Sequence, residues 1–298
     1  MQLSKSITLI PSDQKTTAES LNNMKMFPKF LGSGAVVVAA LALSVSTTQA
    51  QTTAGLINVD FNGNGVGTAY SGGGVASGPS QTGAALIGSA GDSWNGFDDS
   101  AFTFSSFPDN PSASGLALKY ADGSASGVTM SLTAGGSYNA NEPNWGNTSA
   151  FTTAGSPYSS LMQDLLYTTA VSTITLSGLA ANQTFDLILY SAGDQNLSGA
   201  TAKVATFTVN GITQTSSWNG ITSTLIAGQT YVEFASAMSD ASGNLVINFG
   251  GTPAGTGINT ETDLNGFQLI PVPEPSTWAI LGLASMMMVG MRRRVARS

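Results

Sequence analysis

The sequence predicts an all-β protein whose central part, residues 51–270, forms a β-sandwich. Three observations favour this class. Short runs of alternating or β-branched residues recur, clusters of Gly, Asn, Asp and Ser separate them, and almost no segment has helical periodicity. About 220 residues suit one such domain, and neither a linker nor a fixed-period repeat divides them.

The expected strands are short apolar or alternating runs bounded by turn residues. In chain order they are Leu56–Phe61, Gly127–Leu132, Ser172–Leu176, Phe185–Tyr190, Lys203–Val209, Ile212–Ser216, Thr230–Phe234, Asn244–Phe249 and Gly266–Ile270. Asn210-Gly211 predicts a type I′ hairpin between the fifth and sixth runs. The first and last runs should lie in one core, and Ser160–Tyr167 (SLMQDLLY) is the single helical candidate.

The chain has no cysteine and no histidine among its 298 residues, which excludes several chemistries. A disulfide framework, a thiolate nucleophile, a Ser-His-Asp triad and a Cys- or His-ligated zinc are all ruled out. The sequence therefore favours a non-enzymatic protein. A secreted glycoside-active enzyme is the alternative, because paired carboxylates need neither residue type. The acidic residues are scattered, and no pair stands out among Asp98, Asp99, Glu142, Glu233 and the others.

Charge is distributed unevenly along the chain. Lys119 and Lys203 are the basic residues of residues 51–270, against 14 acidic residues, which gives this part a formal charge of −12. Such a surface cannot neutralise a row of phosphates, so nucleic acid is excluded as a partner. The remaining basic residues lie toward the two ends of the chain, near apolar runs, as in targeting segments.

The N-terminal 50 residues are predicted to be an extension followed by a secretory signal peptide. Lys25 and Lys29 precede an apolar run over residues 30–45, and small residues follow it up to Ala50. This order predicts cleavage after Ala50 and a mature chain that begins at Gln51. Residues 1–23 are polar, and translation from Met24 or Met26 would remove them. A buried Ala/Val helix is the alternative.

The C-terminal segment, residues 271–298, has three unlike parts in a fixed order. Pro273, Glu274 and Pro275 come first, an apolar stretch follows over residues 278–291, and Arg292, Arg293 and Arg294 come last. Fourteen helical residues rise about 21 Å, short of the roughly 30 Å hydrocarbon core of a bilayer. The arginines nevertheless favour a single membrane helix with its C-terminus in the cytoplasm.

This segment resembles the PEP-CTERM sorting signal of Gram-negative bacteria, through Val272–Trp278 (VPEPSTW), the short apolar stretch and the arginine cluster. The resemblance implies processing by exosortase, an integral membrane enzyme, after transient anchoring in the inner membrane. It also implies export to the cell surface or to an extracellular matrix of exopolysaccharide and biofilm. An ordinary tail anchor that contains Pro-Glu-Pro by chance is the alternative.

Residues 174–194, the ATFTVNG run and the final LNGFQLI strand resemble jelly-roll domains of the galactose-binding-like class. The resemblance covers about half of residues 51–270 and includes no diagnostic motif. Many domains of that class bind glycans, so it implies a candidate glycan-binding function and no more.

Two further patterns suggest ligands. Asp60, Asn62 and Asn64 match the opening of a calcium-binding loop, but the residue where the closing glutamate would stand is Ser71. A strand ending in an Asn/Gly turn explains the pattern equally, and a different calcium site that uses Asp60, carbonyl groups and a distant carboxylate remains open.

Three tryptophans, Trp94, Trp145 and Trp218, stand beside Asn and Gly in expected loops. An aromatic face suits the C–H side of a sugar ring, and neighbouring amides suit its hydroxyls. These residues are therefore candidate glycan-binding residues. The alternative is that they cap the hydrophobic core.

Overall fold

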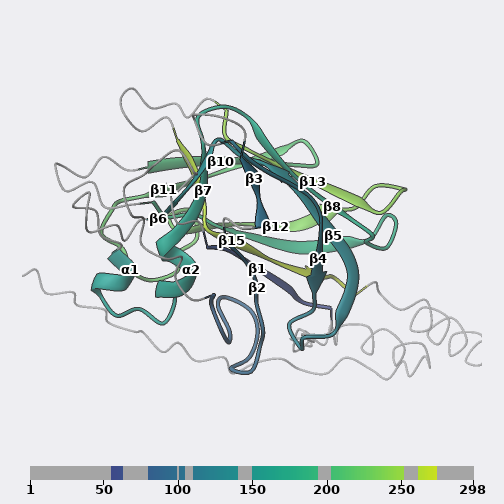
Figure 1. Ribbon diagram of the computed structural model, residues 1–298, viewed down its shortest axis with the longest axis horizontal. Helices are drawn as coiled ribbons and strands as arrows, with labels where there is room; N and C mark the ends of the chain where they lie inside the picture. Colours follow the sequence, from purple (N-terminus) through teal and green to yellow (C-terminus); the bar gives the residue numbers. More distant parts are fainter. Residues whose placement is uncertain are drawn as a thin grey trace, which may run out of the picture. The chain divides into compact units, whose positions relative to one another are not determined.

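The structure is a computed structural model that describes residues 55–62, 80–98, 101–104, 110–139, 150–193, 203–251 and 261–273. Within these residues, fifteen β-strands and two short helices form two large sheets and one small sheet. The strands of the large sheets lie in two layers, with α1 and α2 to one side (Figure 1). The predicted all-β sandwich class is confirmed.

The first large sheet has five strands in the order β12-β9-β15-β1-β2. β1 pairs antiparallel with β15, with Ile57 opposite Leu269, and parallel with β2. The predicted first and last strands are therefore neighbours in one sheet. The bounds are β1 Ile57–Asn62, β2 Asn95–Asp98, β9 Thr184–Tyr190, β12 Tyr231–Met238 and β15 Gly266–Pro271.

The second large sheet has seven strands in the order β11-β10-β13-β8-β5-β4-β3. The turn between β10 and β11 has positive φ at both Asn210 (50°) and Gly211 (76°), as a type I′ hairpin requires, which confirms that prediction. The bounds are β3 Thr103–Phe104, β4 Pro111–Lys119, β5 Ala125–Thr133, β8 Ser172–Ser177, β10 Lys203–Val209, β11 Ile212–Trp218 and β13 Asn244–Phe249.

The third sheet is small, in the order β14-β7-β6, with bounds β6 Gly136–Asn139, β7 Asp164–Thr168 and β14 Thr262–Leu264. The helices are α1 Ala150–Thr153 and α2 Ser159–Gln163. The predicted helix over 160–167 is therefore wrong beyond Gln163, where Asp164 turns extended (φ −114°, ψ 151°). Strand pairing on both edges of β7 overrides the local helical preference there.

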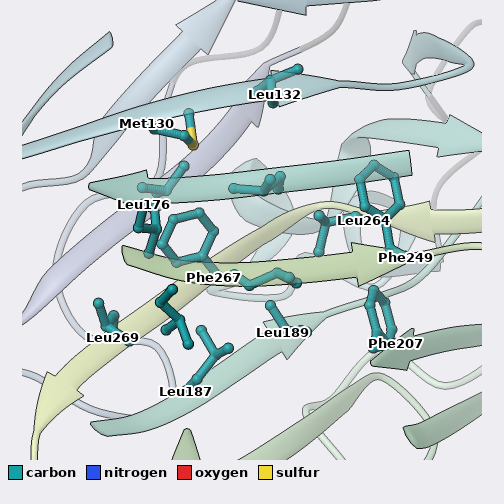
Figure 2. Packing of buried hydrophobic residues seen from close by; sticks show 14 of the residues in the cluster. Met130, Leu132, Leu176, Leu187, Leu189, Phe207, Phe249, Leu264, Phe267 and Leu269 are labelled. Carbon is teal, nitrogen blue, oxygen red and sulfur yellow. The ribbon is translucent and has the colours of Figure 1, made fainter. Parts of the chain in front are cut away.

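The main core lies between the two large sheets. Side chains from β5, β8 and β13 on one side face those from β9 and β15 on the other, as Figure 2 shows. Because side chains alternate along a strand, every second residue of β1, β8, β9 and β13 enters this core. Each fully buried Leu or Phe stabilises the fold by roughly 1.5–3 kcal/mol relative to an exposed one. Figure 2 labels Met130, Leu132, Leu176, Leu187, Leu189, Phe207, Phe249, Leu264, Phe267 and Leu269.

A second apolar cluster includes side chains of β9 that alternate with those in the main core. Ile188 and Tyr190 of β9 pack there, whereas Leu187 and Leu189 enter the main core. The short helices supply much of the second cluster, which explains why both are apolar on one side. Its buried members are Ala150, Phe151, Leu161, Met162, Ile188, Tyr190, Ala192 and Trp218.

Candidate functional site

The expected sorting segment begins directly where the last strand ends. β15 finishes at Pro271, and the Val272 N–H still donates to the Thr184 carbonyl at 2.9 Å. The Val272 carbonyl in turn accepts from the Gln183 side-chain amide at 2.9 Å. Pro273 is exposed. The first proline of the Pro-Glu-Pro run therefore stands at the surface, two residues after the end of the sheet.

The other residues of the expected targeting segments lie outside the described residues. These are Ala50 and Gln51 at the expected signal cleavage, Glu274, Pro275, Arg292, Arg293 and Arg294, and the apolar stretch 278–291. In the part of the chain that the structure describes, neither helix has the length and apolar character needed to cross a membrane.

Trp218 does not present a face for a sugar. It ends β11, is only 2% exposed and donates its indole N–H to the Thr222 carbonyl at 3.0 Å. Its ring belongs to the second cluster, so the core-capping alternative describes its position.

Trp94 is half-buried beside the same cluster. Its indole N–H donates to the Gly83 carbonyl at 2.8 Å, and its ring lies 6.4 Å from that of Tyr190. Trp145 lies outside the described residues. The indole N–H groups of both described tryptophans thus donate to backbone carbonyls within the protein.

Asp60 and Asn62 lie within a strand and not in a loop. β1 is extended through both residues and is paired on both edges, so residues 60–62 do not wrap a cation as an EF-hand loop does. The Asp60 Oδ2 atom accepts from the Gln81 backbone N–H at 2.7 Å, and the Asn62 Nδ2 atom donates to Ser80 Oγ at 2.7 Å. Asn64 lies outside the described residues.

The Asp60 carboxyl is completely buried. Burial raises the pKa of Asp60 well above its ordinary value; the hydrogen bond from the Gln81 N–H opposes this effect, and the charge of Asp164 adds to it. Asp164 is itself 0% exposed at the start of β7. The sequence analysis left open a calcium site with Asp60 and a distant carboxylate, but it did not identify Asp164 as that carboxylate. No local pattern in SLMQDLLY indicates that its aspartate lies beside β1.

A buried polar layer continues from Asp60 along the same face of the five-stranded sheet. Gln268 connects it: its Nε2 atom donates to Asn58 Oδ1 at 2.8 Å and to the Ile87 carbonyl at 2.9 Å. Its Oε1 atom accepts from the Tyr190 hydroxyl and from the Ile87 N–H. These bonds attach the segment 80–94 to the sheet. We call Asn58, Asp60, Asn62 and Gln268 the polar layer.

A groove of about 540 Å³ opens on the outer side of the seven-stranded sheet. It crosses β4, β5 and β8, and hydroxyl side chains dominate its lining. None of the lining residues is charged, and the hydroxyls alternate with core residues such as Ile174. The lining residues are Ser112, Ala113, Ser114, Ser131, Leu132, Thr133, Thr173 and Thr175.

The groove is part of a longer row of hydroxyl and amide side chains across this sheet. Strand pairing places the members side by side, and two neighbouring pairs are hydrogen-bonded: Thr173 Oγ1 donates to Asn248 Oδ1 at 3.0 Å, and the Thr208 and Thr213 hydroxyls are 2.9 Å apart. Such a row offers both donors and acceptors. In sheet order the row is Ser112, Thr133, Thr173, Asn248, Thr208 and Thr213.

Among solved structures, the chain is similar to plant receptor-kinase ectodomains. The ANX2 ectodomain from Arabidopsis thaliana aligns with a TM-score of 0.39 and 15% identity, over 74% of this chain and 51% of that chain. The ANXUR1 extracellular domain from the same plant gives 0.37 and 14%, over 74% and 49%. The chain thus spans about half the length of these structures. No curated protein matches it.

The family comparison concerns the C-terminal segment. The model of the PEP-CTERM protein-sorting motif matches residues 271–294, from the end of β15 to the last residue of the arginine triplet. This match coincides with the segment that the order of Pro-Glu-Pro, apolar stretch and arginines predicts. The chain therefore carries a PEP-CTERM protein-sorting motif, which supports its sorting by exosortase as an exported protein directed to the cell surface.

Proposed function

We propose that the protein is a non-enzymatic component of the cell surface or extracellular matrix that binds a neutral glycan through the hydroxyl-lined groove. The sorting motif at residues 271–294 is the observation that carries the surface location. A signal peptide within the N-terminal 50 residues would start export. The apolar stretch 278–291 would then hold the chain in the inner membrane until exosortase releases it.

The composition of the groove supports a neutral ligand. Its lining has no charged residue, and the surrounding residues 51–270 carry a formal charge of −12, which repels anionic polysaccharides. Serine and threonine hydroxyls match sugar hydroxyls as donors and acceptors. Because no aromatic side chain lines the groove, each contact is weak, and retention in a matrix would depend on many copies engaging one polymer.

The same geometry favours binding over glycoside hydrolysis. Hydrolysis by paired carboxylates needs two carboxyl groups about 5–9.5 Å apart that face the sugar. No Asp or Glu is among the groove-lining residues. Asp60 and Asp164 interact electrostatically, but both are 0% exposed and reach no substrate in this conformation.

The sorting half of the proposal is tested in cells that carry the processing enzyme. Glu274→Ala should leave membrane insertion intact but block trimming, because the apolar stretch and the arginines are unchanged. Replacing Arg292, Arg293 and Arg294 with neutral residues should instead weaken retention and orientation. Glu233→Ala, at an exposed position of β12, is the control. Normal trimming and release of the Glu274→Ala protein would contradict the proposal.

The glycan half is tested by applying the purified full chain, in mild detergent, to a glycan array and to the exopolysaccharide of the producing cells. Thr173→Arg fills the groove with a bulky cation and should weaken binding about tenfold or more, in line with a loss of about 1.4 kcal/mol. Ser236→Arg, at an exposed position of β12 in the other sheet, is the control and should bind normally. Equal binding by both variants would exclude the groove.

A further inference from the structure

We propose that Asp60, Asn62 and Asp164 are ligands of a buried calcium ion that joins β1 to residues 80–81 and to the start of β7. The proposal is independent of the glycan function and of the sorting mechanism. The three residues come from two separate strands, whereas an EF-hand draws its ligands from one continuous loop.

The first observation is a pair of buried oxygen atoms without protein partners. Asp60 and Asn62 point to the same face of β1, and they bond to the adjacent residues Gln81 and Ser80. The two side chains therefore lie next to each other. The Oδ1 atom of each is buried and makes no hydrogen bond, although the residues are only 0% and 5% exposed. A buried oxygen without a partner destabilises the folded state, most of all on a charged group, unless another ligand binds it.

The second observation places Asp164 beside this pair. Asn265 links the two strands: its carbonyl accepts from the Phe61 N–H at 2.9 Å, and its side-chain amide donates to the Asp164 carbonyl at 2.8 Å. Phe61 stands between Asp60 and Asn62 on β1. Asp164 is thus tied to the strand segment that carries the two unpaired oxygens, and its completely buried carboxyl group adds a second negative charge there.

The third observation is the shortage of positive charge. Residues 51–270 contain only Lys119 and Lys203 as basic residues. Lys119 is exposed at the end of β4, and Lys203 begins β10 in the other large sheet. Burying the two carboxyl groups of Asp60 and Asp164 close together is costly. A divalent cation would neutralise both.

The donor atoms select calcium. Carboxylate and amide oxygens are hard ligands, and calcium accepts six to eight of them in irregular geometry, including carbonyls and water. Magnesium demands near-octahedral geometry, and zinc prefers nitrogen and sulfur. Within the described residues, no group of three or more acidic side chains gathers, so carbonyl and water oxygens must complete the shell. With two carboxylates we expect a Kd near 10⁻⁴–10⁻³ M, as in extracellular calcium modules.

The test measures the melting temperature of the full chain in mild detergent, after chelation and then with CaCl₂ or MgCl₂ at up to about 10 mM. The proposal predicts one calcium per chain by isothermal titration calorimetry. It also predicts an upward shift of several degrees, since occupancy at ten or more times Kd stabilises the folded state measurably. The shift should disappear in Asp60→Asn and in Asp164→Asn and persist in the exposed control Glu233→Gln. An equal shift with magnesium would overturn the assignment to calcium.

Asn62→Asp gives an independent measurement if the other variants fold poorly. It adds a carboxylate where an unpaired amide oxygen stands, and Ser80 Oγ is able to donate to it in place of accepting. We expect this variant to be less stable in chelator and to bind calcium at least about tenfold more tightly. No shift in the wild-type protein, an unchanged shift in Asp60→Asn and Asp164→Asn, or unaltered calcium affinity in Asn62→Asp would each overturn the site.

Discussion

Along β1, alternate residues lead to two different interiors. Ile57, Val59 and Phe61 enter the main core, whereas Asn58, Asp60 and Asn62 enter the polar layer on the other side of the sheet. All six are at most 5% exposed. Alternation of this kind usually means that the polar face meets water. Here residues 80–94 cover that face and meet its hydrogen-bonding groups with their own backbone.

The comparison shows that burial is obtained by different means on the two faces. The core face is stabilised by close packing and buried apolar area. When one of its side chains is truncated, neighbouring side chains relax and fill part of the cavity. The polar layer depends on specific pairs, so loss of one partner leaves another buried group unsatisfied. Damage to the core face should therefore lower stability globally, and damage to the polar layer should first loosen residues 80–94.

The largest effect is expected from Phe267→Ala on the core face. Phe267 is completely buried, and its ring lies 6.3 Å from that of Phe61. The truncation should lower the free energy of unfolding by about 3–5 kcal/mol, measured by urea titration of the full chain in mild detergent. Ile212→Ala, at a position 55% exposed, should change it by less than about 0.5 kcal/mol. Equal losses would remove the distinction between core and surface.

Gln268→Leu tests the polar layer at nearly constant volume. The change removes the partner of Asn58 Oδ1, of the Tyr190 hydroxyl and of both backbone groups of Ile87. We expect a loss of about 2–3 kcal/mol, because several buried groups lose their bonds. Hydrogen exchange should accelerate most in residues 80–94. Gln214→Leu, at a more exposed site on β11, is the control, and uniform acceleration throughout the sheet would contradict a local role.

Gly96→Ala tests how closely the covering segment approaches the sheet. A Cβ atom at Gly96 would meet both Ser80 Oγ and Asn62 Nδ2, the latter at 2.9 Å. Overpacking of this kind costs about 1–3 kcal/mol, and here it should displace Ser80 from Asn62. Gly91→Ala is a matched control, because a Cβ there would meet no atom within 4 Å. Similar stability of the two variants would show that Ser80 moves away without cost.

The smallest expected effect is a change in pH dependence. The folded-state pKa of Asp60 is raised by burial, so the folded state keeps a proton that the unfolded chain has already lost. In chelator, this carboxyl group should therefore make the free energy of unfolding fall as pH rises above about 4, the ordinary pKa of aspartate. Asp60→Asn should remove that fall.

The exposed Asp122 provides a control of opposite sign. Hydrogen bonds from the Ser124 hydroxyl and N–H lower the pKa of Asp122, so its stabilisation is present at neutral pH and lost as pH falls. Asp122→Asn should therefore flatten only the acidic side of the profile. If the free energy of unfolding of the Asp60→Asn variant falls with pH as steeply as that of the wild type, the assignment to Asp60 is contradicted.

Sequence patterns predicted the parts of the fold that local chemistry determines. The alternating run at 172–176 and the Asn210-Gly211 turn both lie where their patterns indicated. Strands without a distinctive pattern were missed: β4 runs through PSASGLALK, whose two pairing irregularities break the alternation. Residues 164–167 were predicted as part of a helix because leucine spacing there fits both periods, and only pairing with β6 and β14 decides for a strand.

The candidate sites divide in the same way. The sorting motif is contiguous in the chain, so its residues were identified without any structure. Asp164 and Gln268 were not identified, because the fold brings their partners Asn58, Asp60 and Ile87 to them from about 100 to 210 residues away. The groove is lined mainly by serines and threonines, which form a surface only when three-residue segments of three strands lie side by side.

The antiparallel pairing of β1 with β15 also determines how the protein would respond to force. Ile57 at the start of β1 lies opposite Leu269 near the end of β15, and a Cβ at Gly55 would lie only 3.0 Å from the Pro271 ring. The chain therefore enters and leaves this sheet at the same end. Tension applied between residues 55 and 271 would pull the β1–β15 pair apart from that end. Its hydrogen bonds would break one after another and not all at once. A molecule held by both ends would yield at this pair of strands first, whereas one held by its tail and by a glycan on the other sheet would load a different set of bonds.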